Sequence, residues 1–288
     1  MVIAHLTDRE FWEEEWRKTR RRSGSCHGSH ENDREFWDAL AANYGKRRSL
    51  QDRDRLKQVT EILLAKGALH SGASVLDIGS GPGVYALLFA PHVHEVVSVD
   101  SSPKMCAVLE GQAAEHGITN ITVINAAWEE IEPAKTGWGK RFDLSFASLT
   151  PAVRDPESLI KMVAASRRYC CLVEFARGYK NPVLAELWPA VTGEPYPGGS
   201  FDATYPWNYL YASGYLPDVN FIPDYWEEER PLEEAVKRYC GSFKRYMKVT
   251  PAVEEKVRRF LEARSIEGVF RRSRRGHLAV LFWGVTRN

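Results

Sequence analysis

The sequence has few cysteines, almost no net charge and no long apolar run. Five cysteines in 288 residues are an odd number, which argues against a disulfide framework and is typical of a reducing compartment. Lys and Arg number 39 and Asp and Glu number 38, so no global field favours nucleic acid as a partner. No apolar run reaches the roughly 20 residues that span a bilayer, and charges at Asp8, Arg9 and Glu10 are not typical of a secretory signal. These absences predict a cytoplasmic protein that does not associate with membranes.

The chain shows two sequence patterns: a helical amino-terminal part, and then a long alternation of apolar strands and helices. Apolar residues at helical spacing predict helices over 8–19 and 33–44 and a third helix that ends at Gly67. Short apolar runs then predict strands over 74–78, 93–100, 120–125, 142–148, 169–175 and 277–285, with further helices over 231–247 and 251–264. Strands that alternate with helices specify an α/β fold with a parallel sheet covered on both faces.

The strongest local signal is a glycine loop that follows the strand over 74–78. Gly79, Gly81 and Gly83 allow sharp turns and a close approach of a ligand to the backbone. A dinucleotide fingerprint would need a third glycine at the position of Val84. Asp77, directly before the loop, would repel a phosphate but attract a cation. Asp100 ends the next strand and can accept both hydroxyls of a ribose, although it could instead only cap the following helix. A ribose and a cation without a pyrophosphate describe S-adenosylmethionine.

These residues resemble the class I S-adenosylmethionine-dependent methyltransferases. The loop with Asp77 is similar to the first motif of that family, and Asp100 with the helix that carries Met105 is similar to its second. The segments 125–130 and 142–148 resemble those around the family's third and fourth strands. The resemblance implies a Rossmann-like, doubly wound, seven-stranded mixed sheet. It also implies an amino-terminal helical extension over 1–50 that covers the cofactor, and a methyltransferase domain over 51–288 with a substrate cap within 178–275.

The resemblance also implies a cofactor and a set of residues that would bind it. The methyl donor would be S-adenosylmethionine, with S-adenosylhomocysteine as product. The cofactor-binding residues would be Asp77, Gly79, Ser80, Gly81, Gly83, Asp100, Ser101, Met105, Ala127, Trp128, Ser148 and Tyr44. Ala126 and Ala127 occupy positions where the family usually carries an acid for the adenine amine, so that contact is missing or comes from the backbone or Glu129. Trp128 could stack on the adenine or serve as core packing.

The family's reaction is an in-line displacement at the sulfonium methyl, for which the protein mainly supplies orientation. Residues 148–152 contain neither an Asp/Asn-Pro-Pro-aromatic tetrapeptide nor a Pro-Cys nucleophile, and both absences favour a small-molecule acceptor. One alternative is a non-catalytic scaffold or regulatory module that binds S-adenosylmethionine. Another is aminopropyl transfer, which some proteins of this fold catalyse with extra acids that this chain lacks after its fourth strand.

Several weaker signals lie outside the cofactor motifs. Glu174, inside an apolar strand, and His30 are weak candidates for catalysis. The cluster of Cys26, His27 and His30 lacks a second ligand pair, so no metal site is expected. The basic run 271–275 is typical of a solvated turn. Aromatic side chains that could contact the acceptor are Tyr205, Trp207 and Tyr211, and those that could contact a second copy in a homodimer are Trp12 and Trp16.

Overall fold

The fold is given by a computed structural model, which describes residues 7–22, 30–41, 50–177, 181–196, 201–244 and 246–286, with only the backbone described at 20–22, 30–33 and 50–53. Its helices are α1 (Arg9–Arg22), α2 (His30–Ala41), α3 (Leu50–Ala65), α4 (Val84–Phe89), α5 (Pro103–Glu115), α6 (Pro156–Ala165), α7 (Pro182–Thr192), α8 (Thr204–Ala212), α9 (Leu232–Lys244) and α10 (Pro251–Glu262), with short 3₁₀ turns at Ala90–His92 and Trp128–Glu130. Its strands are β1 (Ser74–Ile78), β2 (Glu95–Asp100), β3 (Ile121–Asn125), β4 (Phe142–Ser148), β5 (Ser166–Phe175), β6 (Asp218–Pro231), β7 (Ser265–Ile266) and β8 (Val269–Gly284).

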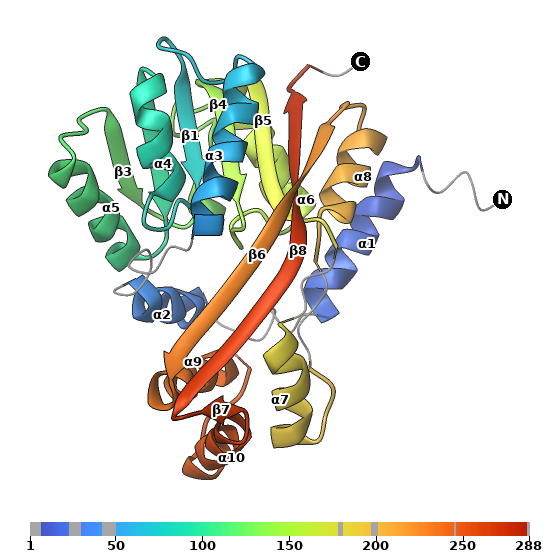
Figure 1. The fold of residues 1–288 in the computed structure, drawn as a ribbon. Coiled ribbons are helices and arrows are strands. Elements are labelled where there is room, and N and C mark those ends of the chain that lie inside the picture. The colour runs from blue at the N-terminus through green and yellow to red at the C-terminus, as the bar shows by residue number, and fades with distance from the viewer. Residues whose placement is uncertain are drawn as a thin grey trace.

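The strands form one mixed sheet with helices on both faces (Figure 1). Their order is β3-β2-β1-β4-β5-β8-β6, and the two-residue β7 pairs with β8 off this path. The first five strands in this order are parallel, whereas β8 and β6 are antiparallel to their neighbours. The predicted α/β class and seven-stranded mixed sheet are therefore confirmed, and the order reverses between β1 and β4, where open sheets bind ligands.

Helix starts follow the capping residues in the sequence. Ser102 accepts a hydrogen bond from the backbone N–H of Met105 at 3.1 Å and starts α5. Asp155 and Ser158 form a capping box that starts α6, and Thr250 caps α10. These caps at Ser102, Asp155 and Thr250 fix where each helix begins.

β6 and β8 extend past the rest of the sheet as a two-stranded ribbon, which we call the arm. The arm is the antiparallel ladder that ends where Pro231 pairs with Val269, and it projects downward in Figure 1. Its outer end carries α9 and α10, which pack with α7 around a separate apolar cluster. β6 was not predicted as a strand, and β8 begins at Val269 rather than at residue 277. β6 tolerates Pro223 inside it because it is the edge strand of the sheet.

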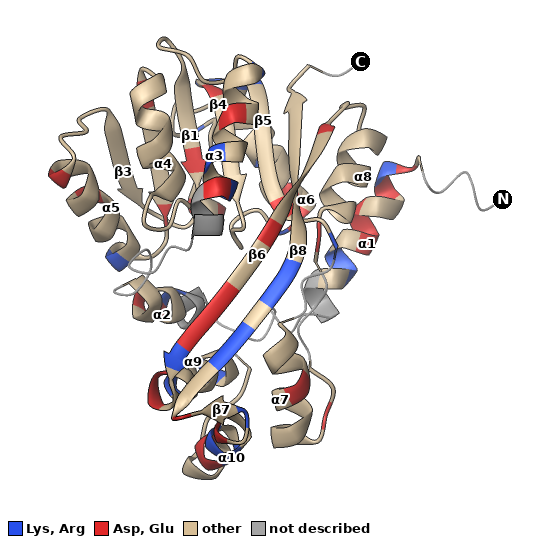
Figure 2. Cartoon of the chain, viewed as in Figure 1, with Lys and Arg blue, Asp and Glu red and all other residues tan. Residues whose placement is uncertain are grey.

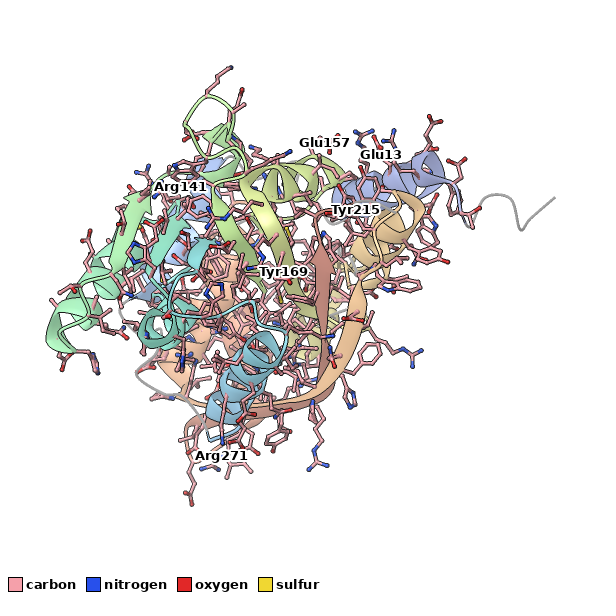
Figure 3. The ribbon with its side chains drawn as sticks, turned by 90° about the horizontal axis from the view of Figure 1, so that it is seen from above. Glu13, Arg141, Glu157, Tyr169, Tyr215 and Arg271 are labelled. Carbon is pink, nitrogen blue, oxygen red and sulfur yellow. The ribbon has the colours of Figure 1, made fainter. Side chains whose placement is uncertain are left out.

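The two amino-terminal helices cover different parts of the molecule. α1 packs on α8, where Trp16 is fully buried and stacks on Phe201 with ring centroids 5.6 Å apart. Figure 3 shows Glu13 and Glu157 close together where α1 meets α6, and Arg17 forms ion pairs with both. Trp16 therefore has no exposed surface for a second copy, and a homodimer stays a prediction.

The aromatic stretch after β5 forms α8, so its odd-numbered aromatics do not form a strand face. Tyr209 is buried against Trp16, whereas half of Tyr211 is exposed. Among the described residues, no helix is long and apolar enough to cross a membrane.

Candidate functional site

A cleft of about 1040 Å³ lies at the carboxyl ends of β1, β2 and β4. One side is formed by α2, which contacts both α5 and α9 and lines the cleft with Phe36, Trp37 and Leu40. The arm and α9 line the opposite end. Of the predicted amino-terminal extension, α2 therefore borders the predicted cofactor site, whereas α1 packs elsewhere.

The glycine loop forms the floor of the cleft. Glycine is needed at its three positions for different structural reasons. All three have positive φ angles, +64° at Gly79, +54° at Gly81 and +77° at Gly83. A Cβ on Gly79 would lie 1.9 Å from Thr150 Oγ1, and one on Gly83 would lie 2.0 Å from Leu109 Cδ1. A Cβ on Gly81 would meet no described atom within 4 Å. Gly79 and Gly83 thus allow packing within the protein, whereas Gly81 keeps open space beside the backbone.

Asp100 holds the loop in place from the end of β2. Its Oδ2 accepts from the N–H of Gly81 at 2.8 Å, and its Oδ1 accepts from the N–H of Ser102 at 2.8 Å. Burial raises the pKa of Asp100, and the hydrogen bonds from Ser102 and Gly81 act in the opposite direction. Each carboxylate oxygen can accept more than one hydrogen bond, so Asp100 keeps capacity for hydroxyl donors in the cleft. The two interpretations made from the sequence, a ribose contact and a helix cap, are therefore compatible, and the ribose contact stays a prediction.

Asp77 is a buried carboxylate that the described residues do not fully satisfy. It is 3% exposed and lines the cleft, and its Oδ2 has no hydrogen-bond partner among the described residues. Burial and the nearby charge of Asp100 raise the pKa of Asp77 to about 7, against a hydrogen bond from Ala86 that lowers it. Ser80 lies beside it with a buried hydroxyl that also lacks a described partner. These unsatisfied atoms and the open space at Gly81 fit a polar, cationic ligand such as S-adenosylmethionine.

The segment after β4 lies against the glycine loop. Ser148, Leu149 and Thr150 line the cleft, and Leu149 has a φ of +48°, which an L-residue rarely adopts. Its N–H donates to the carbonyl of Val173 at 2.9 Å, which fixes this conformation. Such local strain is concentrated at functional sites.

The far wall of this end of the cleft carries the residues predicted near the adenine. Ala127 and Trp128 both line the cleft, as do Ser101 and Met105. Trp128 is only 2% exposed, and its Nε1–H donates to the carbonyl of Ser158 at 3.2 Å. It therefore contributes mainly core packing and presents one edge to the cleft.

The residues proposed for catalysis and for the acceptor lie elsewhere. Glu174 is buried, does not line the cleft, and accepts from the N–H of Phe175 at 2.8 Å. Burial raises the pKa of Glu174 to about 8. The aromatics of α8, Tyr205, Trp207 and Tyr211, are also absent from the lining among the described residues. Tyr44, Cys26, His27 and the side chain of His30 fall outside the described part of the chain. The structure therefore brings the described cofactor residues together in the cleft, except Gly83, which packs against Leu109, and it does not bring these candidates there.

Sequence reasoning missed the end of the cleft that the arm forms. We call this the arm end, and its lining residues are Phe175, Trp226, Arg230, Glu234, Arg238, Arg272 and Arg274. The run 271–275 is not a solvated turn but part of β8. The run shows no alternation of apolar and polar residues, so no local signal marked it as a strand.

Comparison with known proteins agrees with this geometry. A family model described as a methyltransferase domain matches residues 75–170. The chain is 30% identical over 118 residues to 2-heptyl-1-hydroxyquinolin-4(1H)-one methyltransferase of Mycobacteroides abscessus, which is 38% of this chain and 49% of that protein. The match thus spans about half of that relative, and less of the other curated relatives that we compared.

Solved methyltransferase structures share the fold over most of their length. Magnesium protoporphyrin IX methyltransferase from Synechocystis PCC 6803, solved with bound S-adenosylhomocysteine, gives a TM-score of 0.53 at 13% identity over 91% of this chain and 99% of that one. The N-methyltransferase NodS from Bradyrhizobium japonicum, in complex with the same product, gives 0.52 at 12% identity over 88% and 98%. At these identities the similarity concerns the fold alone. The family match over residues 75–170, the sheet order and the glycine loop together support a class I S-adenosylmethionine-dependent methyltransferase.

Proposed function

We propose that the chain transfers the methyl group of S-adenosylmethionine to a small-molecule acceptor. The observation that carries this proposal is the continuity of one cleft. It runs from the glycine loop and Asp100 to the arm end, so both reactants can lie in one space. Enclosure by α2 on one side and by the arm and α9 on the other supports a small acceptor. The first curated relative is named for a small quinolone, which supports the same class of acceptor.

The described residues would hold the cofactor through its polar groups. Asp77 carries the unsatisfied buried oxygen that a cationic group would complete, and Asp100 offers oxygens to the ribose hydroxyls. When bound, S-adenosylmethionine supplies an electrophilic methyl group on a sulfonium. The protein then contributes orientation, exclusion of water and alignment of the acceptor for an in-line displacement.

Apart from Asp77 and Asp100, the described carboxylates that line the cleft are exposed or held in ion pairs: Glu130 is exposed, and Glu129 and Glu234 pair with Arg154 and Arg230. Among the described residues that line the cleft, none is a histidine, a cysteine or a lysine. Tyr85 lines the cleft, but burial raises its pKa to about 12, so at neutral pH its phenol is protonated and can donate a hydrogen bond. We therefore propose that the acceptor arrives as a ready nucleophile or loses its proton to solvent.

The residues of the cleft disfavour one of the two alternative functions, aminopropyl transfer, but not the other, a non-catalytic scaffold. Aminopropyl transfer would place a polycationic acceptor against the arginines of the arm end, which disfavours this reaction. A scaffold or regulatory role would keep cofactor binding without turnover.

The test is calorimetric titration of S-adenosylhomocysteine into the full chain, followed by turnover assays with methyl-labelled S-adenosylmethionine. We expect micromolar binding and transfer to at least one acceptor of a small-molecule panel. If neither S-adenosylmethionine nor S-adenosylhomocysteine binds, the proposal is wrong. Binding without transfer to any acceptor would support the scaffold instead.

A further inference from the structure

The arm sorts its charged residues onto two faces. In the ladder, Glu228 pairs with Arg272 and Trp226 pairs with Arg274, so even-numbered residues of both strands share one face. That face lines the cleft with Trp226, Arg272 and Arg274 and is largely buried. The odd-numbered face carries residues such as Arg271, whose side chain is 55% exposed and which pairs with Glu229. Figure 2 shows the acidic stripe of β6 beside the basic stripe of β8, and Figure 3 shows Arg271 at the edge of the molecule.

Guanidinium groups outnumber carboxylates on the cleft face. Glu228 is 6% exposed and forms ion pairs with three arginines, Arg230, Arg238 and Arg272. Burial alone would raise the pKa of Glu228, but the charges of Arg238 and Arg272 and the hydrogen bond from Arg230 outweigh it and lower the pKa. Three guanidiniums carry more N–H donors than one carboxylate can accept. A second buried carboxylate, Asp224, is likewise shared between Arg55 and Arg274, and Glu234 of α9 forms an ion pair with Arg230.

Aromatic rings lie directly beside these charges. The guanidinium of Arg272 lies 4.2 Å from the ring centroid of Trp226, and that of Arg274 lies 4.8 Å from that of Phe175. Both rings line the cleft and are half-buried. A surface of this kind offers a flat apolar contact next to positive charge, which matches a planar anion.

We propose that the arm end binds the carboxylate of a planar, aromatic acceptor, with Arg238 and Arg272 as the anion-binding side chains. This inference rests on the proposed methyl transfer and adds the chemical class of the acceptor. The competing interpretation is that the arginines only neutralise Asp224 and Glu228. The two interpretations differ in one measurable property: only in the first does a negative charge on the ligand increase its affinity for the arm end.

The first experiment compares a charged probe with its neutral isostere. 1-Naphthoate and 1-naphthamide are titrated into the full chain, each with and without saturating S-adenosylhomocysteine. We expect the naphthoate to bind about tenfold more tightly than the amide, with a preference that shrinks as salt is added. Equal affinity of the two probes would overturn the proposal. Because the probes are also tested without S-adenosylhomocysteine, a failure of cofactor binding is measured separately.

Matched variants locate the effect. Arg238→Gln should lower naphthoate affinity by about fivefold or more, whereas Arg271→Gln, the same charge change on the exposed face, should leave it unchanged. Glu234→Gln removes a half-exposed carboxylate that lines the cleft, and it should raise naphthoate affinity by about twofold. S-adenosylhomocysteine affinity should stay constant in all three variants. Equal losses in Arg238→Gln and Arg271→Gln would mean that only the general field acts, and the proposed site would be wrong.

Discussion

At the loop end of the cleft, glycine conformations and backbone N–H groups make the surface, whereas at the arm end long charged side chains make it. Gly79, Gly81 and Gly83 fix a backbone path that one carboxylate, Asp100, braces. At the arm end, Arg230, Arg238 and Arg272 converge on Glu228 from α9 and two strands. Backbone geometry of this kind admits few substitutions. A side-chain wall can be exchanged residue by residue, so the family can keep its cofactor while changing its acceptor.

The apolar cluster of α7, α9 and α10 at the outer end of the arm allows the strongest test of whether the loop end and the arm end are independent. Phe243 is fully buried and stacks on Trp188 with centroids 4.6 Å apart. Phe243→Ala should lower the free energy of unfolding by about 3–5 kcal/mol through the cavity it leaves, while S-adenosylhomocysteine affinity changes less than about threefold. Chemical denaturation and calorimetry measure the two effects.

A matched variant on the loop side should behave differently. Phe146 in β4 is also fully buried and packs edge-on against Tyr85, which lines the cleft. Phe146→Ala should cost a similar amount of stability and also weaken cofactor binding. If Phe243→Ala weakens binding as much as Phe146→Ala, the two regions are not independent.

The glycine loop gives the next largest effect. Gly79→Ala combines a positive φ with a clash against Thr150 Oγ1 and Cβ, so we expect about 2–5 kcal/mol of lost stability and undetectable S-adenosylhomocysteine binding. The control is Gly67→Ala, which has a similar φ of +65° but no described atom within 4 Å of the new Cβ. It should cost only about 1 kcal/mol and leave affinity unchanged. Equal outcomes would show that strain alone, and not packing on Thr150, selects glycine.

Asp100→Ala should reduce S-adenosylhomocysteine affinity by about 1–3 kcal/mol, because hydroxyl groups and the Gly81 N–H lose their acceptor. The control is Asp143→Asn, which weakens the ion pair between the buried Asp143 and the half-exposed Arg167, at the end of β4 away from the cleft. That variant should lose stability but bind the cofactor normally. Unchanged affinity in Asp100→Ala, measured by calorimetry, would reduce Asp100 to a cap.

The remaining effect is the pH dependence that Asp77 creates, which is spread over several pH units. Its pKa is raised from 3.8 to about 7, so the cation-binding carboxylate form predominates only above that pH. Cofactor affinity should therefore fall by up to about tenfold per pH unit below 7 and level off above it. The unliganded protein should lose stability as the pH rises from about 4 to 7, because there the unfolded chain releases this proton and the folded chain retains it. Asp77→Asn should flatten both profiles, and a profile unchanged by that variant would assign the titration to another group.

The sequence predicted those features that a single segment determines. β1 and β4 begin and end where predicted, and Gly79, Gly81, Asp100 and Met105 line one cleft, while their binding of the cofactor stays a prediction. The arm escaped prediction because it depends on pairing between two distant segments. Pro223, Pro231 and the charges of 227–230 are not typical of a strand until β8 lies beside them. The aromatics of α8 were ambiguous because positions 205, 207, 209 and 211 alternate as on a strand face, while the pairs 205/209 and 207/211 also have helical i, i+4 spacing.

The arm joins two functions in one continuous strand, and this constrains how the protein can change in length. β8 packs residues 278–282 into the sheet and presents Arg272 and Arg274 to the cleft a few residues earlier. Deleting Gly276 would keep the packed residues in place but bring Arg271, Ser273 and Arg275 to the cleft, unless a β-bulge absorbed the change. Insertions or deletions of two residues along this stretch should thus be tolerated better than those of one residue. Whether the number of inserted or deleted residues is even or odd therefore decides which side chains face the cleft.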